Sequence, residues 1–282
     1  MAKYGFRLKG FLLASLIFIN IVTSRFCGTT SGNGNLSSYA LNTSPASRPL
    51  VDFTSSIDIP LPLDGVSEQI LYRKAYIVSY NKDYRIPNWV AWHLTGNHTS
   101  GVVKRPGNAW HEDLEVPTPR ATIPDYKGSG WTRGHMCPAG DNKWDSDAMY
   151  ESFLFTNCCP QHANLNSGTW NQIEISCRNW AERYGDLYIV CGPILFRQEH
   201  EYIGENQVVV PEAFFKVVLC LEKNHEKGIG FVCRNTAGDR KKDFYTNSIT
   251  QVERITGITF FPNLPKELSD KVKNIADLHE WE

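Results

Sequence analysis

The segment WTRGHMCPAGD, residues 131–141, gathers polar side chains in an otherwise apolar neighbourhood. Arg133 and His135 lie two residues apart with Gly134 between them, so on an extended segment their side chains share a face and a ligand can approach the backbone closely. A guanidinium beside an imidazole favours the neutral imidazole, which is the form that accepts a proton. The segment therefore predicts a general base; the simpler alternative is a structural histidine whose neighbouring Arg133 is in a surface ion pair.

A second polar stretch follows at residues 156–166, TNCCPQHANLN, and continues as GTWNQIE at residues 168–174. Asn166, Trp170, Glu174 and Arg178 recur every four residues, so on a helix they form one slowly drifting stripe. Oxygen atoms of Asn166 and Glu174 on nearly the same side suit a hard cation that keeps most of its water. An N-cap at Asn166 and an ion pair between Glu174 and Arg178 would explain these residues separately, but not both stretches together.

Hydrophobic patterning in the rest of the chain predicts a mixed fold. Residues 166–184 form the chief helix candidate, because their apolar side chains recur at three- and four-residue spacing. Shorter helices are expected at residues 248–256 and 266–278. Strands rich in β-branched and aromatic residues are expected at residues 71–80, 89–94, 153–157, 187–191, 214–221 and 228–232. Because strands and helices do not alternate strictly, the predicted fold class is α+β with antiparallel strands.

The composition is that of an ordinary globular protein. The 282 residues are 41% hydrophobic and 21% charged, and the 15 Pro and 21 Gly follow no period, so disordered, collagen-like and coiled-coil classes are excluded. A formal net charge of −1 gives no global sign of a nucleic-acid or acidic-membrane partner.

The N-terminal region predicts export. Residues 1–26 have a basic start, an apolar run from Phe11 to Val22 and a polar exit, which is the order of a secretory signal peptide. The run is too short to span a bilayer permanently. We therefore expect a secreted, periplasmic or cell-surface protein, with a membrane tether through a lipid on Cys27 as the less favoured alternative. Residues 27–64 are expected to be a flexible tether, and residues 65–282 one domain.

Eight cysteines in an exported chain predict disulfide bonds. Cys220 and Cys233 are the preferred pair, because they lie on two apolar runs that read as the strands of a hairpin. If Cys27 is set aside, seven remain, so at least one is free, metal-bound or intermolecular.

Taken together, these motifs resemble the DNA/RNA non-specific endonucleases of the ββα-metal superfamily, the group of the Serratia-type nuclease and endonuclease G. The family motif Asp-Arg-Gly-His is matched by residues 132–135, and its Asn-x-x-Pro-Gln stretch before a metal-binding Asn is matched by Asn157, Pro160, Gln161 and Asn166. Segments at residues 87–94, 192–193, 211–217 and 256–262 are also similar. The resemblance spans roughly residues 65–265 and implies a His-Me finger core with a central antiparallel sheet flanked by helices.

The resemblance also implies a role for each matched residue. His135 is the expected general base, and Asn166 is the expected single protein ligand of Mg²⁺, for which Mn²⁺ is an expected substitute. Further expected roles are orientation of the metal's waters by Glu174, phosphate contacts by Arg105, Arg133 and Arg178, and support by Asn157 and Gln161. The implied reaction is hydrolysis of DNA and RNA to 5′-phosphate ends, with the metal stabilising the leaving group. Nucleic acids are then transient substrates held in a small positive cleft, and no stable protein partner is indicated.

One residue departs from the family motif, and two other functions compete with hydrolysis. Thr132 replaces the family's Asp, which is expected to slow catalysis or shift its pH optimum without changing the reaction. The first competing function is a surface module that captures nucleic acid with weak catalysis. The second is a structural zinc site built from His135, Cys137, Cys158, Cys159 and His162, although these residues lack zinc-finger spacing.

Overall fold

A computed structural model describes residues 59–238 and 240–282. The predicted signal peptide, Cys27 and residues 27–58 of the predicted tether lie outside the described residues. Residues 59–64, which the sequence assigned to the tether, contact the domain. Ile59 and Leu63 pack against its core, and the Leu61 amide donates to the carbonyl of Thr259 at 3.1 Å.

Short strands and helices follow one another without strict alternation. The strands are β1 (Gln69–Tyr72), β2 (Ile77–Asn81), β3 (Ile86–Leu94), β4 (Thr132–His135), β5 (Cys158–Gln161), β6 (Leu187–Ile194), β7 (Glu201–Ile203), β8 (Val208–Val210), β9 (Ala213–Cys220), β10 (Lys227–Arg234) and β11 (Thr246–Asn247). The α-helices are α1 (Gly96–Thr99), α2 (Ile123–Tyr126), α3 (Ser146–Glu151), α4 (Ala163–Leu165), α5 (Asn171–Tyr184), α6 (Ile249–Thr256) and α7 (Lys266–Lys273). The π turn η4 (Asn166–Trp170) joins α4 to α5, and short 3-10 turns include η2 (Ala139–Asp141), η3 (Phe155–Asn157) and η6 (Leu278–Trp281).

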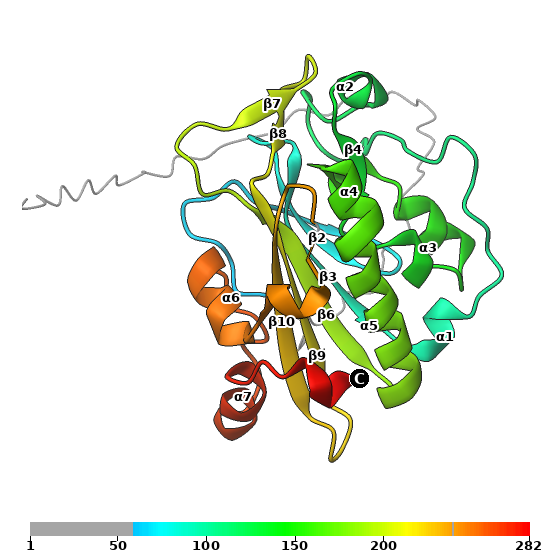
Figure 1. Ribbon diagram of the computed structural model, residues 1–282. Coiled ribbons are helices and arrows are strands. Elements are labelled where there is room, and N and C mark those ends of the chain that lie inside the picture. Colours follow the sequence, from blue (N-terminus) through cyan, green and yellow to red (C-terminus); the bar gives the residue numbers. More distant parts are fainter. Residues whose placement is uncertain (1–58, 239) are drawn as a thin grey trace, which may run out of the picture. The chain divides into compact units, whose positions relative to one another are not determined.

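A seven-stranded sheet in the order β1-β2-β3-β6-β9-β10-β11 forms the centre of the domain. All its neighbouring strands are antiparallel. Helix α5 packs on one face of this sheet, and α6 and α7 pack on the other (Figure 1). The predicted α+β class, with a central antiparallel sheet flanked by helices, is therefore confirmed.

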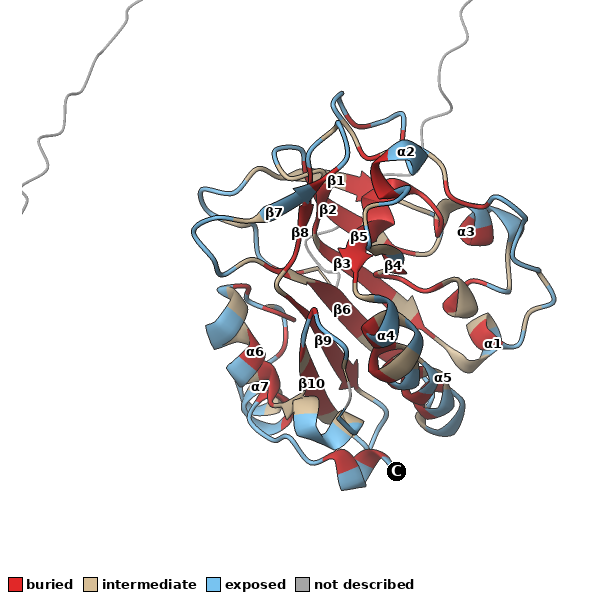
Figure 2. Ribbon diagram, turned by 45° about the horizontal axis from the view of Figure 1, so that its top comes forward, coloured by how far each residue is buried: buried red, intermediate tan, exposed pale blue. Residues whose placement is uncertain are grey.

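The central strands are buried on both faces, as the red strands β6, β9 and β10 show (Figure 2). Side chains alternate along a strand, so each strand contributes to two separate cores. On β9, Phe214 and Val218 pack in the core under α5, whereas Phe215 and Val217 pack in the core under α6 and α7. Lys216 is placed by this alternation on the α5 side.

Most of the predicted elements are present, but two strand predictions are wrong. Residues 71–80 form two strands, because a tight turn closed by the Arg73 amide and the Tyr76 carbonyl at 2.8 Å separates β1 from β2. Residues 153–157 are apolar and buried but end in the turn η3, and the strand β5 begins only at Cys158. Residues 266–278 begin as a helix at Lys266, but α7 ends at Lys273.

The prediction of disulfide bonds is wrong for the described part of the chain. All seven cysteines there, at positions 137, 158, 159, 177, 191, 220 and 233, are free and buried. The hairpin β9–β10 exists, but its register pairs Cys220 with Lys227 and Cys233 with Phe214. The two thiols therefore lie at opposite ends of the hairpin, beyond the reach of a disulfide.

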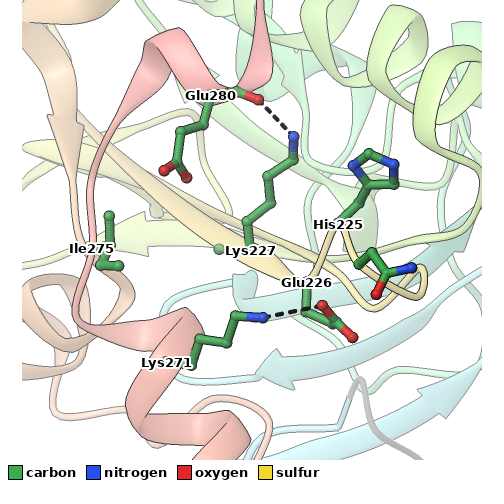
Figure 3. Close-up of a pocket in the computed structure, with 8 residues that line it drawn as sticks. His225, Glu226, Lys227, Lys271, Ile275 and Glu280 are labelled. Carbon is green, nitrogen blue, oxygen red and sulfur yellow. Dashed lines mark hydrogen bonds and ion pairs between the residues drawn. The ribbon is translucent and has the colours of Figure 1, made fainter.

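The C-terminal segment folds back onto the turn between β9 and β10. Lys227 Nζ donates to the Glu280 carbonyl at 2.6 Å and lies 3.5 Å from the centre of the Tyr184 ring. Figure 3 shows Lys227 pointing toward Glu280, and Lys271 of α7 paired with Glu226, around a cavity of about 370 Å³. This cavity contains none of the predicted site residues. No helix within residues 59–238 and 240–282 is long and apolar enough to cross a membrane.

Candidate active site

The hairpin of β4 and β5 positions the predicted site residues. Its antiparallel register pairs Thr132 with Gln161 and His135 with Cys158. Gly134 permits this packing, because a Cβ there would overlap the Gln161 side chain. After β5 the chain enters α4, the turn η4 and α5 directly. Two strands followed by a helix thus carry the site, in the order that the resemblance predicts.

His135 lies at the end of β4 with its ring packed between two aromatic rings. Its centroid is 4.4 Å from that of Trp110 and 4.9 Å from that of Phe153. Burial, with a smaller contribution from the Arg105 guanidinium, lowers the pKa of His135 to about 3. The imidazole is therefore neutral at neutral pH, as the sequence predicted, although the cation responsible is Arg105 rather than Arg133. Its Nε2 atom is shielded from solvent and has no hydrogen-bond partner among the described residues.

Two predicted phosphate-binding arginines reach the same aromatic rings. Arg105 Cζ lies 4.8 Å from the centre of the Phe153 ring, and Arg133 Cζ lies 5.9 Å from that of Trp110. Arg133 and His135 therefore share one face of β4, as the spacing predicted. Both arginines are exposed, so they are open to a phosphate, which a guanidinium can hold with two parallel hydrogen bonds.

Asn166 lies at the first residue of the π turn η4 and is fastened to β4 through its amide nitrogen. Its Nδ2 donates to Thr132 Oγ1 at 3.0 Å and to the Arg133 carbonyl at 3.4 Å, and Thr132 Oγ1 donates to the Gln161 carbonyl at 2.7 Å. These contacts use the amide hydrogens and leave the oxygen Oδ1 as the acceptor. An amide oxygen is a ligand that Mg²⁺ accepts.

The predicted four-residue stripe is not carried by one regular helix. Gly168 in η4 has φ −100° and ψ −110°, which are not helical values, so Asn166 lies before the regular turns of α5. Glu174 is in the first turn of α5. Burial raises the pKa of Glu174 to about 7, while Lys216 and Arg178 act in the opposite direction. The Glu174 carboxyl group therefore changes its charge close to neutral pH.

Arg178 is paired with Asp141 rather than with Glu174. Its Nη1 donates to Asp141 Oδ1 at 3.0 Å, and Trp92 Nε1 donates to the other carboxylate oxygen at 3.1 Å. The Asp141 side chain is only 2% exposed. Gly140 permits the approach, because a Cβ there would lie 2.8 Å from Arg178 Nη1. Arg178 is thus partly buried and held beside the site.

Asn157 and Gln161 are both fully buried beneath β4. The Asn157 side chain accepts from the Cys137 amide and donates to the carbonyls of Cys137 and Ser152, each at 2.8 Å. It therefore fixes the chain immediately after His135. The amide atoms of Gln161 have no hydrogen-bond partner among the described residues, and this side chain packs on Gly134.

A cavity of about 460 Å³ lies beside Arg105, which lines it. Gly140, which the Arg178 guanidinium approaches, also lines this cavity. Lys104 and Lys143 also line it, and none of its lining residues is acidic. A negatively charged backbone suits such a surface.

Four residues with contacts to the site were missed in the sequence: Trp110, Thr132 as an anchor of Asn166, Asp141 and Lys216. Asp141 closes the polar segment 131–141, and its position there was a usable signal. Lys216 interrupts the apolar run FFKVVL at residues 214–219, where a charge inside a buried strand is unusual. The contact of Trp110 with His135 has no signal in the sequence, because the two residues lie far apart along the chain.

The donor atoms of the site fit a hard divalent cation and not zinc. Asn166 Oδ1 and the Glu174 carboxyl group are oxygen ligands of the kind that Mg²⁺ prefers, and few protein ligands suit an ion that keeps several waters. No group of three or more His, Cys, Asp or Glu within residues 59–238 and 240–282 is arranged to hold a metal. This finding counts against the zinc alternative.

Comparisons with known proteins agree with this arrangement. A model of the DNA/RNA non-specific endonuclease family matches residues 61–267. The mitochondrial nuclease EXOG of Xenopus laevis is 35% identical over 221 residues, which cover 73% of this chain and 61% of that protein. Nuclease C1 of Cunninghamella echinulata var. echinulata is 33% identical, over 71% of this chain and 85% of that protein. Mitochondrial endonuclease G of Bos taurus is 31% identical, over 72% of each.

A solved structure has the same fold. The crystal structure of a complex between EndoG and EndoGI, described as showing the mechanism of EndoG inhibition, matches with a TM-score of 0.69 and 26% identity. The match covers 74% of this chain and 92% of that one. The ββα-metal fold class is thereby confirmed. This chain spans about three fifths of the length of the EXOG proteins it matches.

The prediction of an exported protein is contradicted by these comparisons. EXOG of Xenopus laevis and endonuclease G of Bos taurus are both named as mitochondrial proteins. The prediction rested on residues 1–26, which lie outside the described residues. A basic start without acidic residues opens mitochondrial leaders as well as signal peptides, so this composition does not separate the two destinations. The free thiols also remove the support that disulfides would have given to export.

Proposed function

The chain belongs to the DNA/RNA non-specific endonuclease family, and on that premise we propose that it hydrolyses phosphodiester bonds in DNA and RNA. The observation that carries the proposal is the neutral His135 ring, which lies beside two exposed arginines. A base poised to accept a proton, next to cations that suit a phosphate, is what phosphodiester hydrolysis needs.

In the proposed reaction, the neutral His135 imidazole takes a proton from the attacking water. Arg105 and Arg133 bind the phosphate oxygens, where negative charge concentrates in the transition state. Cleavage on the 3′-oxygen side leaves a 5′-phosphate. Because these side chains address the backbone and not the bases, we expect cleavage of DNA and RNA without sequence preference.

We propose Mg²⁺ as the cofactor and Asn166 Oδ1 as its protein ligand, with Mn²⁺ as a substitute. When bound, the ion supplies positive charge beside the leaving oxygen. Thr132 and the Arg133 carbonyl hold the Asn166 side chain, and Glu174 is proposed to orient water at the site.

Removal of the metal is expected to abolish cleavage. Excess EDTA should stop the digestion of supercoiled plasmid and of RNA, and Mg²⁺ or Mn²⁺ added back should restore both, because the protein offers too few ligands to compete with a chelator. Gel analysis of both substrates measures the effect. Undiminished cleavage in EDTA would contradict a metal-dependent mechanism, whereas stable binding without nicking in Mg²⁺ would favour the capture module instead.

Thr132→Val is expected to weaken metal binding by roughly 10- to 100-fold, the usual cost of losing a group that orients a metal ligand. The substitution keeps the shape of the side chain but removes the hydroxyl that accepts from Asn166. The Mg²⁺ concentration for half-maximal cleavage measures the change. Thr132→Ser keeps the hydroxyl and is the matched control, so an equal loss in both variants would exclude this role.

A further inference from the structure

Asn235 lies directly after β10, and its buried side chain joins the β4–β5 hairpin to the central sheet. Its Oδ1 accepts from the His162 amide at 2.8 Å, and its Nδ2 donates to the Pro160 carbonyl at 3.1 Å and to the Pro211 carbonyl at 2.8 Å. The Asn235 backbone amide donates to the Glu212 carbonyl at 2.9 Å. Asn235 is therefore fixed beside the start of β9 and holds the end of β5 there.

The groups that Asn235 binds near the end of β5 belong to an open strand edge. Among the described residues, β4 and β5 form a sheet of two strands, so one edge of β5 has no strand beside it. The Pro160 carbonyl and the His162 amide lie on either side of Gln161, and a parallel neighbouring strand would bind this pair of groups. The Asn235 carboxamide, which resembles a peptide group, takes the place of that strand. It thereby satisfies backbone groups that are costly to bury without a partner.

His162 connects Asn235 to the proposed metal ligand. The His162 amide donates to Asn235, and the His162 carbonyl accepts from the Asn166 amide at 2.9 Å. The Asn166 side chain donates to Thr132, whose hydroxyl in turn donates to a carbonyl of β5 at 2.7 Å. The backbone and the side chain of Asn166 thus both depend on where residues 160–162 lie.

We propose that Asn235 is a positioning residue that sets the place of Asn166 Oδ1 at the metal site by holding the junction between β5 and α4. It acts through His162 and Asn166 rather than on the substrate. The inference rests on the proposed function, because it matters for turnover only if Asn166 binds the metal. When few protein atoms hold an ion, the placement of each one weighs heavily in the affinity.

Asn235→Ala is expected to weaken Mn²⁺ binding by roughly 10- to 100-fold, the usual cost of losing a residue that orients a metal ligand. Alanine leaves the His162 amide and two carbonyls without their partner, so the junction and Asn166 shift. Electron paramagnetic resonance of substrate-free full-length protein measures affinity and stoichiometry separately. A lower stoichiometry at wild-type affinity would show only a loss of folded protein and would overturn the proposal.

Asn247→Ala is the matched control. Asn247 lies on β11, beside β10, and its side chain donates to the Tyr245 carbonyl at 2.9 Å. This bond also holds a backbone segment, but not the junction between β5 and α4. We expect the variant to bind Mn²⁺ with wild-type affinity. An equal loss of affinity in both variants would exclude a specific role for Asn235.

Asn235→Asp covers the case in which the alanine variant does not fold. Aspartate keeps an oxygen that can accept from the His162 amide, but its carboxylate cannot donate to the carbonyls of Pro160 and Pro211 and is repelled by them. The junction is then displaced, and Mn²⁺ affinity should fall. Wild-type affinity in this variant would contradict the proposal.

Hydrogen exchange tests the same contacts without metal or substrate. In either Asn235 variant, the amides of His162 and Asn166 should exchange at least about tenfold faster, relative to the Val218 amide in the middle of β9. Equal acceleration of all three amides would show global destabilisation alone and overturn the proposal, as would an unprotected His162 amide in the wild type. A wild type without nuclease activity would refute the proposed function, while hydrogen exchange would still test the hold of Asn235 on the junction.

Discussion

His135→Ala is expected to lower kcat at least about a hundredfold, which is the usual contribution of a general base. The ring at this position is neutral at neutral pH, which is the form that accepts a proton. Alanine leaves water without an acceptor while Arg105, Arg133 and Asn166 remain in place. Initial rates of plasmid nicking at saturating Mg²⁺ measure the effect.

The matched control is His279→Ala, because His279 is an exposed histidine in the C-terminal turn η6. This variant should cleave at the wild-type rate. Circular dichroism of both variants checks that the fold is retained, since the His135 ring packs between Trp110 and Phe153. Activity of His135→Ala within a few fold of wild type would remove this residue from the role of base.

Asn166→Ala is expected to abolish cleavage at ordinary Mg²⁺ concentrations by removing the only direct protein ligand in the proposal. Because few protein atoms hold such an ion, the loss of one cannot be compensated by its neighbours. Direct titration with Mn²⁺, followed by electron paramagnetic resonance in the absence of substrate, should show a large loss of affinity. Nicking assays across a wide range of Mg²⁺ concentrations give the corresponding loss of activity.

Asn164→Ala is the control for that experiment. Asn164 lies two residues earlier and is exposed, and only its backbone amide is engaged, by His162 at 3.2 Å. We expect this variant to bind metal and cleave as the wild type does. Wild-type Mn²⁺ affinity in Asn166→Ala would place the metal elsewhere.

Elements with a clear apolar period were predictable from the sequence, and elements set by tertiary contacts were not. The strands β6, β9 and β10 and helix α5 are long and periodic, so their positions followed from the pattern. Residues 153–157 also contain apolar side chains, yet they end in a buried turn. The backbone of His111 hydrogen-bonds to the backbone of Phe153 and Phe155 there. Their strand-like composition reflects burial rather than extended conformation.

The candidate site shows the same division between local pattern and distant contact. The two-residue spacing of Arg133 and His135 was enough to place them on one face, because β4 is extended. The π turn η4 was not predictable from the sequence. The prediction that Asn166 and Arg178 lie on one stripe of a single regular helix was therefore wrong. The neutral state of His135 was predicted, but its main cause is burial among aromatic rings contributed by distant segments.

The central sheet divides the consequences of mutation into two classes. The predicted site residues are on the α5 side of the sheet or in the hairpin above it, whereas Phe215, Val217 and Phe260 form part of a separate core beneath α6 and α7. A substitution in that second core lowers the amount of folded protein without touching a reacting group. A substitution around Trp170 or Phe214 alters both abundance and turnover. Selection for activity can therefore act on one side of the sheet while the other drifts within the limits of stability.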